Sequence, residues 1–156
     1  MRARLLPLLL SLLPLLPARA GAEDLALIVH PQNLVKELSA SELREILLVE
    51  RQHWRGSGRI YLLLPESGTA EKELLLRRAL GMNEDQLHRL YLGKLYAGEI
   101  ASFPRVVQSG AAARRIVERA PNALGVVEVS ALDAGVRVLR IDGKRPGEPG
   151  YLLRSQ

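Results

Sequence analysis

The hydrophobic positions of this chain fall into short continuous runs and into longer segments with helical spacing. Largely apolar runs occupy residues 25–29, 60–64 and 124–129, and each lies between polar or turn-forming residues. Such runs are typical of strands that are buried on both faces of a sheet. Residues 136–141 predict one further strand, in which apolar and polar positions alternate, and residues 151–153 are long enough for a short edge strand.

Helical spacing marks four other segments, and each begins at a residue type that caps helices. Ser39 is followed three residues later by Glu42, which predicts a capping box. Thr69, Asn83 and Ser109 precede the other three segments in the same way. The helix after Asn83 is expected to bury Leu87, Leu90, Tyr91 and Leu95.

The order of these elements is strand, helix, strand, three helices and two strands. This order predicts an α/β fold in which part of the sheet is parallel. Residues 102–107 are expected to form a connector without secondary structure. We place the folded domain at residues 23–143, and residues 144–156 form a Pro/Gly-rich C-terminal tail that we expect to be loose over 144–149.

The first twenty residues have the pattern of a secretory signal peptide. Two arginines precede a Leu/Pro-rich apolar run over residues 5–17, and residues 18–20 match the A-x-A cleavage pattern. We expect cleavage after Ala20, with Ala22 as the alternative, and export to the periplasm or the extracellular space. An uncleaved membrane anchor is disfavoured, because the run is short for a spanning helix and contains three prolines.

Composition excludes several classes of site. The chain has no cysteine, so it carries no disulfide, thiol nucleophile, zinc–thiolate site or lipid-attachment cysteine. The formal net charge is +5, but Arg2, Arg4 and Arg19 lie in the expected signal peptide, which leaves +2 for the exported chain. The remaining basic residues are interleaved with glutamates and do not predict a nucleic-acid interface.

The sequence contains no pattern that indicates catalysis or a metal. His30, His53 and His88 are far apart, and no H-E-x-x-H motif is present. Residues 56–58 read Gly-Ser-Gly, but they precede a strand and do not form a nucleophile elbow. We therefore expect a protein that is not an enzyme and that needs no cofactor or metal.

One junction has the residues of an anion cradle. Ser67, Gly68 and Thr69 lie between the strand at 60–64 and the helix that follows, where backbone N–H groups have no helical partner. Hydroxyls at such a position also serve as ordinary N-caps, and that alternative stays open. Ser109 and Gly110 open another helix in the same way and are weaker candidates.

Four segments, in order, resemble the periplasmic phosphate-binding proteins, the solute-binding subunits of phosphate ABC transporters. Residues 38–54 are similar to a helix and a tryptophan-bearing loop of that family, and residues 67–69 match its phosphate-contacting Ser-Gly-Thr. Residues 121–127 read Pro-Asn-Ala-Leu-Gly-Val-Val and are similar to its Pro-Gly-Ala-Ile-Gly-Tyr-Val strand. Residues 141–154 are similar to its C-terminal Asp-Gly and Tyr-Pro-Leu endings.

The resemblance implies a reduced type II periplasmic-binding fold, with a mixed sheet flanked by helices. Family members are roughly twice as long, and the part with a second phosphate loop and a buried aspartate has no counterpart here. Leu63 stands where the family has an arginine, and Val49 or Glu50 stands where it has a glycine. A charged partner for an anion would then come from elsewhere, with Arg55, Arg59 and Arg105 as candidates.

The resemblance therefore implies an exported periplasmic protein that binds phosphate or another small oxyanion for uptake or sensing. It would work with a membrane transporter or a periplasmic partner protein, and its binding would be weaker than that of the full-length family. The alternative is a periplasmic interaction or adaptor module that has lost the ligand site. Whether two copies rebuild the missing lobe stays open.

Overall fold

A five-stranded mixed sheet organises the protein, whose computed structural model describes residues 23–155. Its strands are β1 (Leu25–Val29), β3 (Tyr61–Pro65), β4 (Arg105–Val107), β5 (Ala123–Glu128) and β6 (Arg137–Val138), in the order β4-β3-β5-β1-β6. Strand β3 pairs in parallel with both β4 and β5, whereas β1 is antiparallel to its neighbours β5 and β6. The expected mixture of parallel and antiparallel pairing is therefore confirmed.

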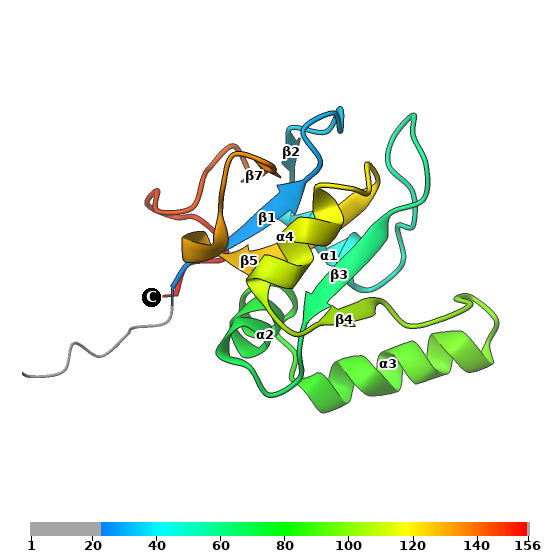
Figure 1. Cartoon of the computed structure of the whole chain (residues 1–156). Coiled ribbons are helices and arrows are strands. Elements are labelled where there is room, and N and C mark those ends of the chain that lie inside the picture. Colours follow the sequence, from blue (N-terminus) through cyan, green and yellow to red (C-terminus); the bar gives the residue numbers. More distant parts are fainter. Residues whose placement is uncertain (1–22, 156) are drawn as a thin grey trace, which may run out of the picture.

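Helices cover both faces of this sheet. They are α1 (Ala40–Leu47), α2 (Ala70–Leu75) with its π-helical continuation Leu76–Leu80, α3 (Glu84–Tyr96) and α4 (Gly110–Val117). Helix α4 packs on one face, and α1 and α2 pack on the other (Figure 1). The long helix α3 runs along the side of the molecule where β4 forms the sheet edge (Figure 1).

The two hydrophobic clusters follow the strand period of two. In β1, Ala26 and Ile28 belong to the cluster beneath α4, whereas Leu25, Leu27 and Val29 belong to the cluster beneath α1 and α2. All five residues of β1 are fully buried, as the continuous apolar run predicted.

The predicted caps form in the structure. The Ser39 side chain accepts from the Glu42 amide at 3.1 Å, and the Glu42 carboxylate accepts from the Ser39 amide at 2.9 Å, which completes the capping box. Asn83 and Gln86 form a second capping box at the start of α3. These contacts satisfy amides that the helices themselves leave without partners.

Residues 136–141 do not form the single strand that we expected. Leu139 is fully buried and donates from its amide to the Leu27 carbonyl, and Arg140 then donates to the Lys36 carbonyl. The chain thereby passes from β6 into β7 (Arg140–Ile141), which pairs in parallel with β2 (Glu37–Leu38) in a separate two-stranded sheet. The alternation of apolar and polar residues correctly predicted extended backbone here, but it did not predict that the chain passes from one sheet to another.

Two further expectations about the middle of the chain are wrong. Residues 105–107 form β4 rather than a connector, because β3 has a free parallel edge that they pair with. Leu95 is 37% exposed rather than buried, since the buried side of α3 consists of Leu87 and Tyr91 and the last turn extends beyond it.

The C-terminal segment is held in place rather than loose. Tyr151 is buried and donates from its hydroxyl to the Leu25 carbonyl at 2.8 Å, and the Leu25 amide donates to the Leu153 carbonyl at 3.0 Å. The Gly147 amide donates to the Asp24 carboxylate at 3.0 Å. Hydrogen bonds therefore connect the segment after residue 144 to the start of β1. The proposed domain limits, residues 23–143, remain a prediction.

A short 3₁₀-helix, Val129–Ala131, follows β5. Between residues 23 and 155, each helix is either too short or too polar to cross a bilayer. The predicted signal peptide lies outside the described residues.

Candidate ligand-binding site

The carboxyl ends of three parallel strands meet at one small pocket. Strands β4, β3 and β5 run in the same direction and end at Val107, Pro65 and Glu128, which all line this pocket. Its cavity volume is about 50 Å³. A single water needs roughly 10–15 Å³ by the same kind of measure, so the pocket has room for a few waters or one small ion.

Thr69 lies on one wall of the pocket and begins α2. Its hydroxyl accepts from the Lys72 amide at 3.2 Å and donates to the Glu66 carbonyl at 2.7 Å. Gly68 has a φ of 76°, which allows the chain to turn sharply from β3 into the helix. Ser67 and Gly68 are exposed beside it. The local geometry is that of an N-cap, and the hydroxyl is engaged within its own loop.

Ser109 and Gly110 lie on the opposite wall and begin α4. The Ser109 hydroxyl accepts from the Ala112 amide at 3.1 Å. A Cβ added at Gly110 would lie 2.8 Å from the Ala131 Cβ, closer than real Cβ contacts come. Glycine therefore lets the start of α4 approach the loop after β5. The structure brings Thr69, Ser109 and Gly110 to one pocket, which their separation in sequence did not indicate.

The Gly68 amide already donates a hydrogen bond to a carboxylate of the protein itself. Glu84, at the first position of α3, accepts from the Gly68 N–H at 3.0 Å. This contact joins the start of α3 to the loop between β3 and α2. A carboxylate is thus bound where the sequence predicted an anionic ligand.

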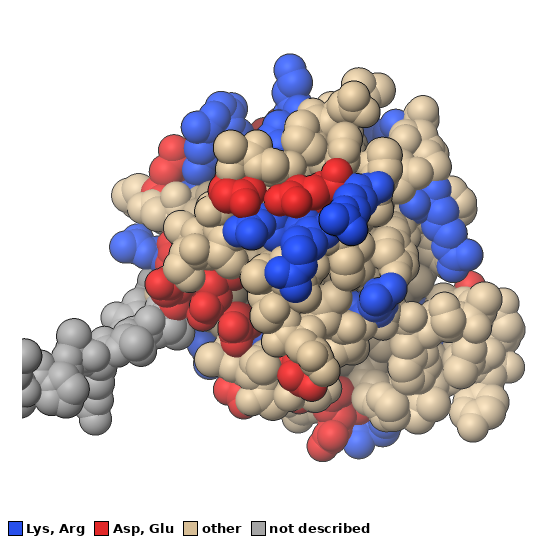
Figure 2. Space-filling view, in the orientation of Figure 1, with Lys and Arg blue, Asp and Glu red and all other residues tan. Residues whose placement is uncertain are grey.

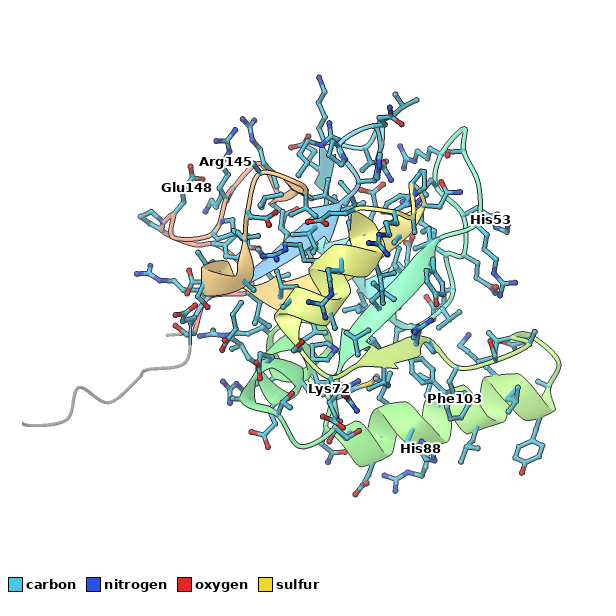
Figure 3. The ribbon with its side chains drawn as sticks, in the orientation of Figure 1. His53, Lys72, His88, Phe103, Arg145 and Glu148 are labelled. Carbon is cyan, nitrogen blue, oxygen red and sulfur yellow. The ribbon has the colours of Figure 1, made fainter. Side chains whose placement is uncertain are left out.

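Lys72 is a buried cation beneath the same loop. Its side chain is 5% exposed, and its Nζ donates to the Pro65 carbonyl at 3.3 Å. Burial lowers the pKa of Lys72, and the negative charge of Glu84 acts in the opposite direction. Figure 3 labels Lys72 where α2 lies beside the start of α3.

Sequence reasoning overlooked Lys72, although a signal was present. Leu75, Leu76 and Ala79 follow it at three, four and seven residues, which places the lysine on the apolar stripe of its helix. A cation on a buried face needs polar partners, so this spacing marks a candidate site residue.

The pocket is also lined by three glutamates that the sequence analysis did not single out. These are Glu66, Glu71 and Glu128. Burial raises the pKa of Glu128, and the charges of Glu71 and Glu23 raise it further. Figure 2 shows acidic side chains gathered near the end of β5 and α2. The electrostatic character of the rim is therefore negative, although the helix N-termini that face the pocket are positive.

The arginine candidates lie elsewhere. Arg55 pairs with Glu42 at 2.9 Å in the loop after α1. Arg59 and Arg105 line a separate pocket at the amino end of β3. Within residues 23–155, no group of three or more histidine, aspartate or glutamate side chains is arranged to hold a metal ion.

Solved structures of phosphate-binding proteins share the fold described above. A solved structure from Clostridium perfringens, described provisionally as a phosphate ABC transporter substrate-binding protein with bound phosphate, superposes with a TM-score of 0.65 at 19% identity. The superposed region covers 80% of this chain and 47% of the Clostridium perfringens chain. An ABC-type phosphate transport receptor from Vibrio cholerae gives a TM-score of 0.64 at 16% identity, over 80% of this chain and 48% of that one.

PstS from Borrelia burgdorferi gives a TM-score of 0.66 at 14% identity, over 85% of this chain and 54% of that one. No family model matches the sequence, and no curated protein matches it. The fold predicted from the resemblance is therefore confirmed, as α/β with a mixed sheet flanked by helices. The chain spans about half the length of the solved structures that it matches. The first two of these structures are described as a transporter substrate-binding protein and a transport receptor.

Proposed function

We propose that this chain is an exported, periplasmic solute-binding-like module that binds a small oxyanion such as phosphate, for uptake or sensing. The observation that carries the proposal is the meeting of Thr69 and Ser109, with the N-termini of α2 and α4, at one pocket. Thr69, Ser109 and Gly110 line this pocket and would contact the anion directly, whereas Ser67 and Gly68 lie beside it in the same loop as Thr69. Helix N-termini that converge in this way favour negative charge.

Lys72 would supply a positive charge for the anion, since Leu63 stands where the resembling family has an arginine. The ammonium uses the Pro65 carbonyl as one hydrogen-bond acceptor, and it has three N–H groups to donate. Charge-assisted hydrogen bonds are about twice as strong as neutral ones, so a buried ammonium supports anion binding more than exposed arginines do. Lys72 does not itself line the pocket, so its charge would act on the anion from behind Pro65, whose carbonyl it contacts.

The three glutamates favour an oxyanion that carries protons. A phosphate hydroxyl donates to a carboxylate oxygen, whereas sulfate at neutral pH has no proton to donate. Because the pKa of Glu128 is raised, its carboxyl takes up a proton more readily as pH falls and then repels an anion less. We therefore expect phosphate to bind better than sulfate, and to bind better at mildly acidic pH.

Glu84 makes this binding weak. Its carboxylate holds the Gly68 amide at 3.0 Å, so an incoming anion must displace it or do without that donor. Hydrogen bonds to charged groups contribute about 1.5–3 kcal/mol, which is about tenfold or more in affinity.

The test is a thermal-shift titration of the exported chain with phosphate and sulfate, confirmed by isothermal titration calorimetry. A ligand at 100 times its Kd adds roughly 2.7 kcal/mol of stability. We expect a saturable response to phosphate that is lost in Ser67→Ala/Thr69→Ala and reduced in Ser109→Ala. Because removing a cap lowers stability by about 0.5–2 kcal/mol, Ser39→Ala at the start of α1 is the matched control.

The acidic rim favours a second candidate, an interaction or adaptor module for a membrane transporter or another periplasmic protein. Glu66, Glu71 and Glu128 would then receive a basic side chain of the partner. In that case no oxyanion stabilises the protein, and Ser67→Ala/Thr69→Ala leaves the partner interaction unchanged. A charge substitution such as Glu71→Gln weakens it instead.

A further inference from the structure

A second and larger pocket lies at the opposite end of the parallel strands from the candidate oxyanion site. It has a volume of about 560 Å³ and is formed by the loop after α1, the start of β3 and residues 102–105. Ligand pockets for small organic molecules typically measure about 300–1,000 Å³. This pocket therefore has the size of an organic ligand rather than of an inorganic ion.

Three arginines give this pocket a positive charge. Arg51, Arg59 and Arg105 line it, and none of the described residues that line it is acidic. Arg59 donates to the neutral Gln52 side chain at 3.1 Å, and Arg105 donates to the Tyr61 hydroxyl at 3.0 Å. These contacts orient the two guanidinium groups without neutralising them.

The third arginine is only partly compensated. Arg51 lies 2.8 Å from the Glu42 carboxylate, and Arg55 lies 2.9 Å from the same oxygen. One negative charge therefore serves two guanidinium groups. The described residues that line the pocket therefore carry a positive charge, in contrast to the acidic rim at the carboxyl ends of the strands.

The rest of the lining is mainly apolar. Ile46, Ile60 and Leu62 are buried residues that the pocket reaches, and Phe103 is partly buried beside them. The Phe103 ring meets the His88 ring edge to face, with centroids 5.5 Å apart, which fixes its orientation (Figure 3). An apolar surface next to oriented guanidinium groups suits a ligand with one anionic end and one apolar body.

The walls of the pocket are preorganised. The Ile60 amide donates to the Gln52 carbonyl at 2.8 Å, and His53 and Arg59 form an antiparallel bridge. The buried Trp54 indole donates to the Asn122 carbonyl at 3.0 Å and fastens the loop to the start of β5. Because the pocket is already formed, ligand binding requires less ordering of its walls and therefore costs less conformational entropy.

We propose that this pocket binds a small organic anion, with a carboxylate or phosphate group on Arg59 and Arg105 and an apolar body against Ile60, Leu62 and Phe103. Arginine pairs with both kinds of anionic group in bidentate geometry, so the shared chemistry is a planar or tetrahedral oxyanion joined to a hydrocarbon. The site is independent of the proposed oxyanion pocket, because the two lie at opposite ends of the parallel strands.

The test is isothermal titration calorimetry of the exported chain with phenylacetate, phenyl phosphate, benzyl alcohol and inorganic phosphate. Phenylacetate or phenyl phosphate is expected to bind with saturation, and the preferred one identifies the anionic group. Benzyl alcohol has the ring without the charge and is expected to bind at least about tenfold more weakly, which corresponds to one charge-assisted hydrogen bond.

Two variants locate the site. Arg59→Gln/Arg105→Gln removes two exposed guanidinium groups and is expected to weaken binding of the aromatic anion at least about tenfold. Ser102→Trp fills the pocket from its exposed rim and is expected to abolish binding. The control is Arg115→Gln/Arg119→Gln, which removes two exposed arginines on and after α4 and leaves the affinity unchanged.

Three results overturn the proposal: no heat of binding with either aromatic anion, equal affinity for benzyl alcohol, or unchanged affinity in Arg59→Gln/Arg105→Gln. Inorganic phosphate separates this site from the other one. Phosphate binding that is lost in Ser67→Ala/Thr69→Ala but kept in Arg59→Gln/Arg105→Gln belongs to the pocket between α2 and α4. Absence of phosphate binding there would leave the proposal for the organic anion unaffected.

Discussion

The Glu84 carboxylate accepts a hydrogen bond from the Gly68 amide at 3.0 Å. This contact connects the start of α3 to the loop that the sequence identified as an anion cradle. Its consequence is that the protein supplies its own anion. Within this loop, Thr69 caps α2 and Glu84 accepts from the Gly68 amide.

Replacing Glu84 with glutamine is expected to tighten phosphate binding about tenfold, because it removes a charged competitor worth about 1.5 kcal/mol or more. The measurement is isothermal titration with phosphate. Asp85→Asn is the matched control, since it removes a neighbouring negative charge from the same first turn of α3. Equal effects of the two substitutions would mean that general charge, rather than the Gly68 contact, limits affinity.

Lys72 links the candidate site to the stability of the protein. Burial lowers its pKa below the ordinary value of 10.5, so the folded state binds fewer protons at this group than the unfolded state does. The free energy of unfolding attributable to Lys72 therefore rises with pH between the folded pKa and the unfolded one. At neutral pH the buried ammonium costs stability.

We expect Lys72→Met to remove this alkaline rise, because methionine keeps the apolar contacts of the lysine stem without a titrating group. The measurement is urea unfolding at several pH values from 7 to 10, as the difference between the wild type and the variant. The same variant is expected to lose the phosphate response. Lys94→Met, at an ion pair with Glu99, serves as the control. If the free energy of unfolding of the wild type changed with pH in parallel with that of Lys72→Met, the alkaline rise would not come from Lys72.

Glu42 gives the opposite pH dependence. The Ser39 amide, followed by the Arg51 side chain, lowers the pKa of Glu42 below its ordinary value of 4.5. The stabilisation is therefore fully present above the unfolded pKa and is lost as pH falls through the folded pKa. Arg55 adds little, because its side chain is 81% exposed.

Glu42→Gln is expected to lower the free energy of unfolding by about 1 kcal/mol at pH 7, since it keeps the capping box but loses the charge on Arg51. Urea unfolding at pH 7 and near pH 3 measures the effect, and the difference from wild type is expected to shrink at the lower pH. Glu45→Gln in the same helix is the control. A loss of the same size at both pH values would show that packing, rather than charge, is responsible.

The sequence predicts the local pieces of this protein better than their assembly. The caps at Ser39, Thr69, Asn83 and Ser109 depend on a few neighbouring residues, and all four form. The division of residues 136–141 between two sheets depends on which strands lie nearby, which spacing in one segment does not specify.

The same limit applies to the candidate site. Thr69 and Ser109 line one pocket because β3 and β4 pair in parallel. The sequence did not predict this pairing, since residues 105–107 were expected to be a connector. Val49 is a case in which the sequence was informative. Val49 or Glu50 was expected at the position of a family glycine, and Val49 has a φ of 57°, in the left-handed region that β-branched residues rarely adopt.

Glu128 makes the proposed oxyanion site dependent on pH. Burial, then the charges of Glu71 and Glu23, raises the pKa of its carboxyl above the ordinary value of 4.5. A protonated Glu128 no longer repels an anion in the pocket, so phosphate affinity is expected to rise as pH falls through the folded pKa. The same proton uptake stabilises the fold, because the folded state then binds more protons at this group than the unfolded state.

Glu128→Gln mimics the protonated carboxyl and is expected to bind phosphate more tightly at pH 7, with a flatter pH profile between pH 5 and 8. Glu73→Gln, on the exposed side of α2, removes an equal charge outside the pocket and is the control. Calorimetric titrations of the three proteins with phosphate across this range measure the effect. If Glu128→Gln kept the wild-type pH profile, the pH dependence would arise from the phosphate itself, and the rim carboxylates would have no part in selecting the ligand.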